Sequence, residues 1–251
     1  MSKLLELYNQ TSKHSGYQEI PKVLSSILNP GKISYNSRFE TQRFEYISSQ
    51  VAFKDKSVVD IGGNTGYFAF SALDEGASRV DVYEGNKNHA KFVQLAAKEV
   101  GLSNRLKVFG EYYTFGENEK DKYDIAFILN VVHHIGDDFE YKSYSEMSVK
   151  EKMCDVINSM TNRCDQMVLQ LGFNWKGNTN KPIFEGGLKK NMIKFVRGCT
   201  HKMWEVKSIG VPVKTDNSIV YRELGEDNIE RDNALGEFLN RPLFILQRKG
   251  S

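Results

Sequence analysis

The sequence predicts an α/β protein with a Rossmann-like, mostly parallel sheet and helices on both faces. Two observations carry this fold class. Short apolar segments alternate with amphipathic segments along much of the chain, and alternating strands and helices build a parallel sheet covered on both faces. Residues 123–130 form a nearly continuous apolar run, which is typical of a central strand buried on both faces.

The remaining elements follow in order along the chain. Residues 58–61 and 79–83 are rich in valine and isoleucine, which favours strands. Residues 88–101 carry apolar side chains at helical spacing and end at a glycine, a common helix stop. The same patterns predict strands at 105–109, 166–171, 206–213 and 243–247, and a helix around 153–160.

The first fifty residues differ from this alternating pattern. Apolar residues within 4–7 and 23–28 indicate short amphipathic helices, and residues 38–47 indicate another. We therefore predict an N-terminal helical lid or brace over residues 1–50. A catalytic domain is predicted over residues 51–251, with a substrate-specificity insertion at about 173–207.

Composition sets limits on the function. The chain has 251 residues, 40% of them apolar and 26% charged, which is ordinary for one enzyme domain. The net charge of +2 gives no general argument for nucleic-acid binding. Cys154, Cys164 and Cys199 form no C-x-x-C pair and suggest a reducing, cytoplasmic location, with Cys154 and Cys164 as core residues of a helix. Neither a secretion signal nor a membrane-spanning run is expected.

A glycine-rich turn directly after the first strand is the strongest functional signal. It runs from Asp60 to Tyr67 and holds Gly62, Gly63 and Gly66. The dinucleotide pattern G-x-G-x-x-G fails here, because Asn64 and Tyr67 stand where glycines are needed. A Walker loop fails as well, because Tyr67 and Ser71 stand where its second glycine is needed.

The spacing acidic-x-Gly-x-x-x-Gly resembles motif I of the class I S-adenosylmethionine-dependent methyltransferases, and the resemblance extends over roughly residues 55–248. It implies seven strands with an antiparallel final strand. It implies S-adenosylmethionine as cofactor, S-adenosylhomocysteine as product and no metal. Glu84, after the second strand, matches the acid that holds the ribose, since a carboxylate accepts two hydrogen bonds from a vicinal diol. The cofactor-binding residues are then predicted to be Asp60, Gly62, Gly63, Asn64, Gly66, Tyr67, Glu84 and Asn130.

Two histidines, His133 and His134, follow the strand at 123–130. Ligands of open parallel sheets bind outside the carboxyl ends of the strands. A histidine titrates near neutrality and is suited to remove a proton from an acceptor hydroxyl. We predict that His133 or His134 is catalytic; the alternative is that one of them, rather His134, only packs or bonds backbone.

The insertion at 173–207 carries eight basic residues and two glutamates, or 8 − 2 = +6. With its interspersed aromatic residues, this charge favours a small anionic acceptor. The alternative is a solvated helix face, neutralised by the acidic stretch at 223–237. The candidate acceptor-binding residues are Arg38, Trp175, Lys176 and Lys181.

These observations predict an enzyme, a methyltransferase that O-methylates a phosphorylated or nucleotide-linked sugar of surface-polysaccharide biosynthesis. The chain resembles methyltransferases of such pathways and, more faintly, a tRNA-modifying group. The resemblance lies in the sequence of motif I, in the histidine pair and in residues 240–244. The low net charge argues against tRNA and nucleic acid generally. A non-catalytic, methyltransferase-like binding domain is the remaining alternative.

Overall fold

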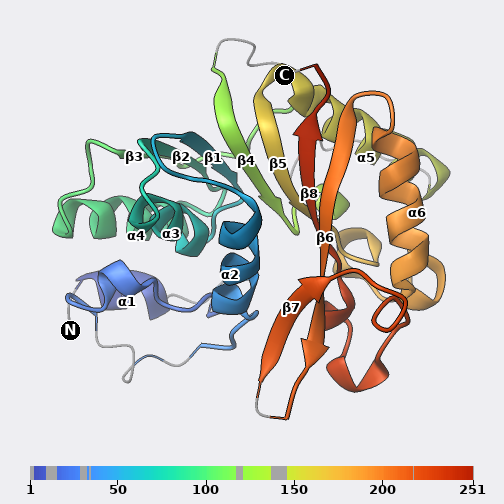
Figure 1. The fold of residues 1–251 in the computed structure, drawn as a ribbon. Helices are drawn as coiled ribbons and strands as arrows, with labels where there is room; N and C mark the ends of the chain where they lie inside the picture. The colour runs from blue at the N-terminus through green and yellow to red at the C-terminus, as the bar shows by residue number, and fades with distance from the viewer. Residues whose placement is uncertain are drawn as a thin grey trace. The chain divides into compact units, whose positions relative to one another are not determined.

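The computed structural model describes residues 3–9, 16–28, 33, 35–116, 121–136, 146–216 and 218–250. The chain divides into two compact units, Met1–Tyr113 and Thr114–Ser251, and each is described by itself (Figure 1).

The first unit is built on three parallel strands in the order β3-β2-β1. They are β1 (Ser57–Ile61), β2 (Arg79–Tyr83) and β3 (Leu106–Phe109). The valines and isoleucine of β1 and β2 are almost completely buried, as expected for parallel strands covered on both faces. All three strands agree with the sequence prediction to within a residue or two.

Helices connect and flank these strands. The described helices of this unit are α1 (Lys3–Asn9), the 3-10 turn η1 (Lys22–Leu24), α2 (Glu40–Gln50), α3 (Tyr67–Asp74) and α4 (Lys87–Glu99). Helix α4 begins at a capping residue, because the Asn86 side chain accepts hydrogen bonds from the backbone N–H groups of Asn88 and His89. The short helices expected in the first fifty residues are therefore present as α1, η1 and α2.

The second unit has five strands in the order β4-β5-β8-β6-β7. They are β4 (Tyr123–Leu129), β5 (Cys164–Gln170), β6 (Trp204–Lys214), β7 (Ile219–Glu223) and β8 (Leu243–Arg248). Strands β4 and β5 are parallel, whereas the pairs β5/β8, β8/β6 and β6/β7 are antiparallel. The antiparallel final strand is confirmed.

Two details of the predicted sheet are wrong. The structure describes eight strands instead of seven, and the five strands of the second unit are mostly antiparallel. The additional strand is β7, whose Ile219, Val220 and Tyr221 are strand formers. It forms a hairpin with β6, closed by the hydrogen bond from the Thr215 N–H to the Ser218 carbonyl. In Figure 1 this hairpin extends beyond β8.

The helices of the second unit include two long ones, α5 (Glu146–Ser159) and α6 (Lys189–Thr200). Single 3-10 turns supply the rest: η3 (Val132–His134), η4 (Met160–Asn162), η5 (Trp175–Gly177), η6 (Glu185–Gly187), η7 (Asn233–Leu235) and η8 (Phe238–Asn240). The predicted insertion at 173–207 thus comprises an irregular segment, helix α6 and the start of β6. The irregular part, before α6, is the part that contains the candidate Trp175, Lys176 and Lys181.

The cysteines differ from the prediction. Cys154 of α5 and Cys199 of α6 are joined by a disulfide, although no pairing was expected from their spacing. Cys164 is free and buried, but it lies at the start of β5 and not in a helix. Pairing of residues so distant in sequence depends on the packing of α5 against α6, which the cysteine spacing alone does not reveal. None of the described helices has the length and apolar character needed to cross a membrane.

Candidate functional site

The glycine-rich turn links β1 to α3 and is held against the end of β2. The backbone N–H groups of Gly62 and Gly63 both donate to the Tyr83 carbonyl, at 2.8 and 3.3 Å. Gly66 has a φ of 84° and is the N-cap of α3. The Gly66 N–H donates to the Gly63 carbonyl at 2.8 Å, which closes the turn.

Gly63 is required by close approach. A Cβ at this position would lie 2.6 Å from Val82 Cγ1 and 3.1 Å from Asp60 Oδ2. Real Cβ atoms do not come this close to a carbon atom, so a side chain here would force β2 and the turn apart. The sequence pattern of glycines therefore has a steric cause at this position.

Glu84 lies just after β2 and shapes the turn. Its Oε2 accepts the backbone N–H of Asn64 at 2.7 Å, and its Oε1 accepts the backbone N–H of Asn86 at 2.7 Å. Asn64 itself has a φ of 52°, so the carboxylate holds a left-handed residue in place. A carboxylate can accept two hydrogen bonds from a vicinal diol, which is the role predicted for Glu84.

Asp60 is buried at the end of β1, with 2% of its surface exposed. Its Oδ2 has no hydrogen-bond partner within the part of the chain that the structure describes. Burial, and next the negative charge of Glu84, raise the pKa of Asp60 to about 7. A buried acceptor oxygen beside Gly63 is what a ligand with hydroxyl or amino donors would satisfy. The turn thus fits S-adenosylmethionine, which carries both kinds of donor.

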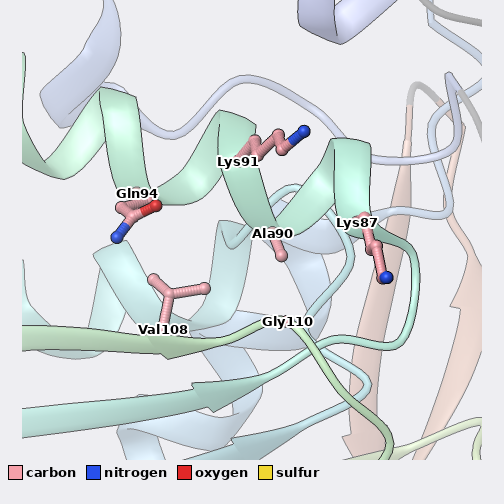
Figure 2. Close-up of a pocket in the computed structure, with 6 residues that line it drawn as sticks. All are labelled: Lys87, Ala90, Lys91, Gln94, Val108 and Gly110. Carbon is pink, nitrogen blue, oxygen red and sulfur yellow. The ribbon is translucent and has the colours of Figure 1, made fainter.

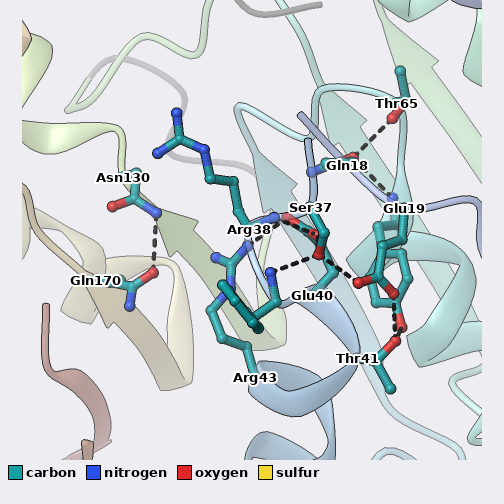
Figure 3. Close-up of polar contacts among 12 residues, drawn as sticks. Gln18, Glu19, Ser37, Arg38, Glu40, Thr41, Arg43, Thr65, Asn130 and Gln170 are labelled. Atoms are coloured by element: carbon teal, nitrogen blue, oxygen red, sulfur yellow. Dashed lines mark hydrogen bonds and ion pairs between the residues drawn. The ribbon is translucent and has the colours of Figure 1, made fainter. Parts of the chain in front are cut away.

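A polar network from the N-terminal segment reaches the same turn (Figure 3). The Gln18 side-chain oxygen accepts from the Thr65 hydroxyl at 3.0 Å and from the Tyr67 N–H at 3.2 Å. Thr41 donates to Glu19 at 2.6 Å, and its hydroxyl lies 2.9 Å from that of Tyr67. Gln18, Glu19 and Thr41 were not predicted as site residues, because no sequence motif has a spacing that connects residue 18 with residue 67.

Arg38 belongs to the first unit, in the strand-like approach to α2. Its guanidinium carbon lies 4.6 Å from the centre of the Tyr17 ring, and its backbone N–H donates to Glu40 at 3.0 Å. Glu40 is completely buried and is paired with Arg43 at 2.8 Å. Arg38 is therefore placed by the N-terminal helical region, whereas the other candidate acceptor-binding residues belong to the second unit.

A shallow pocket of about 210 Å³ lies in the first unit beside α4 and β3 (Figure 2). Ala90 and Val108 form its apolar floor, and Lys87, Lys91 and Gln94 stand around it. None of the predicted site residues lines this pocket. The cofactor is therefore expected at the glycine turn and not in this pocket.

Asn130, at the carboxyl end of β4, has a φ of 62°. Its side-chain NH2 donates to Gln170 at 3.0 Å, and its side-chain oxygen accepts from the Arg241 guanidinium at 2.7 Å. The amide is thus engaged within the protein, so Asn130 shapes the end of the strand. Gln170 and Arg241 were not among the predicted site residues.

The two histidines have different surroundings. His133 is almost completely buried, and its Nδ1 accepts the backbone N–H of Gly172 at 3.0 Å. His134 is half-buried, and its ring centre lies 4.4 Å from that of His133. The alternative prediction, that one histidine only packs or bonds backbone, named His134 first, whereas the imidazole seen to bond backbone is that of His133. A neutral imidazole that accepts at Nδ1 carries its proton on Nε2, so His133 has no free basic nitrogen.

Trp175, Lys176 and Lys181 lie together in the second unit. The ammonium groups of Lys176 and Lys181 lie 4.9 and 5.0 Å from the centre of the Trp175 ring. Lys176 also donates to the Gly136 carbonyl at 2.7 Å, and the indole N–H donates to the Ile135 carbonyl at 2.8 Å. Three of the four predicted acceptor-binding residues thus lie beside the segment that follows His134.

Other basic residues of the insertion serve the structure of the unit. Lys189, which is 2% exposed, donates to the carbonyls of Asn228 and Glu230 at 2.9 and 2.8 Å. Burial lowers the pKa of Lys189. Lys190 lies 3.9 Å from the Glu230 carboxylate. The acidic stretch therefore contacts the start of α6 mainly through backbone carbonyls, and Lys189 does not belong to the solvated helix face of the alternative interpretation.

Comparison with known proteins supports the fold. No family model matches the sequence, and no curated protein is significantly similar to it. The fold is similar to that of the bifunctional kinase-methyltransferase WbdD, with 13% identity and a TM-score of 0.60 over 98% of this chain and 46% of WbdD. The chain therefore spans about half the length of WbdD. A ribosomal protein L11 methylase from Lactobacillus delbrueckii subsp. bulgaricus gives 13% identity and a TM-score of 0.49 over 88% and 84%.

The likeness to WbdD is one of fold, since the identity is low. It agrees with the order of the strands, the glycine turn after β1 and the acid after β2. The chain therefore has the fold of the class I S-adenosylmethionine-dependent methyltransferases.

Proposed function

We propose that this protein is an enzyme, an S-adenosylmethionine-dependent methyltransferase that O-methylates a small anionic acceptor. The observation that carries the proposal is the pair of carboxylates at the glycine turn. Glu84 is a carboxylate, a group that can accept two hydrogen bonds from a diol, and Asp60 has a buried oxygen with no hydrogen-bond partner among the described residues. A ligand that is rich in hydrogen-bond donors binds where acceptor oxygens can satisfy them, and these two carboxylates supply such oxygens.

The chain's own residues divide the work. Residues of the first unit, from Asp60 to Tyr67 and Glu84, would bind and orient the cofactor, which supplies the methyl group when bound. Residues of the second unit would bind the acceptor and remove its proton. His134 is the better candidate for the base, because the Nδ1 of His133 already accepts the Gly172 N–H.

The acceptor class follows from charge. Lys176 and Lys181 place two ammonium groups beside the buried Trp175 indole, and these charges would attract a phosphate. Lys189 and Lys190 contact the acidic stretch instead. A phosphorylated or nucleotide-linked sugar intermediate of surface-polysaccharide biosynthesis has this chemistry.

Two measurements test the proposal. Titration calorimetry is expected to show binding of S-adenosylhomocysteine and none of NAD. A cofactor-turnover screen is then expected to detect phosphorylated or nucleotide-linked sugars and to give no signal with the matching neutral sugars. Binding of NAD without heat from S-adenosylhomocysteine would refute the cofactor. Binding without turnover on any acceptor would favour a non-catalytic binding domain, and turnover on tRNA alone would favour the tRNA-modifying alternative.

A further inference from the structure

Two segments of the second unit run side by side after β4 and β5, and they carry the histidines and the candidate acceptor-binding residues. They are residues 130–136 and 170–176. Several hydrogen bonds join them: the Asn130 N–H to the Gln170 carbonyl, the Asn130 side-chain NH2 to the Gln170 side-chain oxygen, the Gly172 N–H to His133 Nδ1, the Trp175 indole N–H to the Ile135 carbonyl, and the Lys176 ammonium to the Gly136 carbonyl. The position of each histidine thus depends on both segments.

The contact between the Asn130 and Gln170 side chains belongs to a closed ring of three residues. Asn130 donates to Gln170 at 3.0 Å, Gln170 donates to the Arg241 carbonyl at 3.2 Å, and the Arg241 guanidinium donates to Asn130 at 2.7 Å. Gln170 is completely buried and Arg241 is 9% exposed. A ring of buried hydrogen bonds allows little rotation of any member, because each rotation leaves a buried polar group unsatisfied.

Glu237 holds the arginine from the other side. Its carboxylate accepts from Arg241 Nη2 at 2.7 and 3.0 Å and from Nε at 3.2 Å. One of its oxygens also lies 3.4 Å from the Phe173 N–H, which donates to it. Contacts from Glu237 and Arg241 therefore reach residues 130, 170 and 173, on both sides of the bond between His133 and Gly172.

That bond leaves little tolerance for movement. A Cβ on Gly172 would lie 2.6 Å from the ring of His133, so the ring packs directly on the glycine backbone. A small shift of either segment would break the bond or force the ring to rotate. His134 follows in the same 3-10 turn, and its N–H donates to the Val131 carbonyl at 2.9 Å.

We propose that Arg241, oriented by Glu237, is a positioning residue that fixes the segment 130–136 and through it both histidines. This proposal rests on the proposed function only for the effect that Arg241 would have on catalysis. Arginine suits the role because its planar fork bonds Asn130 and Glu237 at the same time in fixed directions. A lysine would keep the charge but not the two directions.

The first test needs neither cofactor nor acceptor. Imidazole ¹⁵N and backbone NMR spectra, recorded well above the ordinary histidine pKa of about 6.5, are expected to show His133 with an unprotonated, hydrogen-bonded Nδ1. Arg241→Gln and Arg241→Lys are both expected to lose this signature and to shift the Gly172 amide. The matched control is Arg248→Gln, since Arg248 also pairs with a carboxylate, Asp165, at the other end of β8. The control is expected to keep both signals.

Glu237→Gln provides a second variant if Arg241→Gln does not fold, because its carboxylate is partly exposed and Arg241 remains. It is expected to give the same loss of the His133 signature. Unchanged His133 and Gly172 signals in any folded Arg241 variant, or equal changes in Arg248→Gln, would overturn the proposal. A rescue by Arg241→Lys would show that charge alone matters and would overturn it too.

The second test concerns catalysis. With an acceptor found in the screen, Arg241→Lys is expected to lower kcat by roughly tenfold to a hundredfold, because reacting groups lose alignment, with little change in the Kd of S-adenosylhomocysteine. An unchanged kcat beside a lost His133 signature would refute the catalytic consequence. A wild-type protein that binds no cofactor would refute the proposed function, while the NMR result would still decide whether Arg241 positions the histidines.

Discussion

At the scale of single residues, Asp60 makes stability depend on pH. Burial and the charge of Glu84 raise its pKa to about 7, above about 3.9 in an unfolded chain. The folded state keeps the proton between these values while the unfolded chain releases it. The stability contributed by the protonated group is thus complete below about pH 4 and is lost as the pH rises through about 7.

Asp60→Asn stays neutral, so it should leave the free energy of unfolding nearly unchanged at about pH 4 and raise it by ~1–3 kcal/mol at about pH 8. Urea unfolding without ligand at the two pH values measures this difference. The exposed Asp74→Asn on α3 is the control and is expected to show no such gain. Equal effects of Asp60→Asn at both pH values would contradict the assignment.

Glu84 is expected to act on cofactor affinity in two ways. It would bind the ribose diol, and it accepts the N–H groups of Asn64 and Asn86 that set the turn. Glu84→Gln removes the charge and one acceptor oxygen, so calorimetry should show a Kd for S-adenosylhomocysteine about tenfold to a hundredfold higher. Hydrogen exchange of residues 62–66 should increase as well. The exposed Glu99→Gln on α4 serves as control, and an unaltered Kd in Glu84→Gln would mean that another acid holds the ribose.

His133 and His134 should separate in their effects. His134→Ala is expected to lower turnover by about a hundredfold with cofactor affinity kept, as for loss of a general base. His133→Ala should instead lower the free energy of unfolding by ~1–3 kcal/mol, because it leaves the buried Gly172 N–H unsatisfied. Steady-state kinetics and urea unfolding distinguish the two, with the exposed His201→Ala as control. Near-normal turnover in His134→Ala would leave alignment or an ionised acceptor as the mechanism.

At the scale of elements, the start of α6 depends on Lys189. The helix has no side-chain cap, and Lys189 connects its first turn to residues 228 and 230 through two carbonyls. Lys189→Met should therefore lower the free energy of unfolding by ~1–3 kcal/mol, since the two carbonyls lose a charged donor. The neighbouring Lys190→Met removes only an exposed 3.9 Å ion pair and should cost less than ~0.5 kcal/mol. Equal losses in the two variants would show that Lys189 does not hold the helix.

At the scale of the whole molecule, the disulfide between α5 and α6 should stabilise one unit and not the other. Cys154 and Cys199 both belong to the second unit. Thiol titration of the unfolded, unreduced protein should find one thiol, that of Cys164, and three after reduction. Reduction should lower the stability of the second unit by ~2–4 kcal/mol. Hydrogen exchange should increase in peptides from residues 121–250 and stay unchanged in peptides from residues 35–113. A titration that finds three thiols without reductant would refute the disulfide.

The elements were predictable because their signals are local. Hydrophobic periodicity placed β1 to β5 and α4, and the glycine turn and Glu84 followed from spacing within one βαβ unit. Strand β7 was not predicted, because a short strand of a hairpin and an irregular loop can have similar sequences. The pairing of Cys154 with Cys199 was missed because the 45 residues between them carry no sign of which helices touch.

The sequence by itself determined the fold class, the position of the glycine turn and the acid that follows it, since each depends on neighbours in the chain. Only the tertiary structure decided which side chains are engaged. In the folded protein, His133 is bonded to Gly172 and Asn130 is bonded to both Gln170 and Arg241. Lys189 is bonded to the Asn228 carbonyl. These contacts join residues about 39 to 111 positions apart, and a hydrogen bond depends on distance in space, which spacing along the chain does not fix.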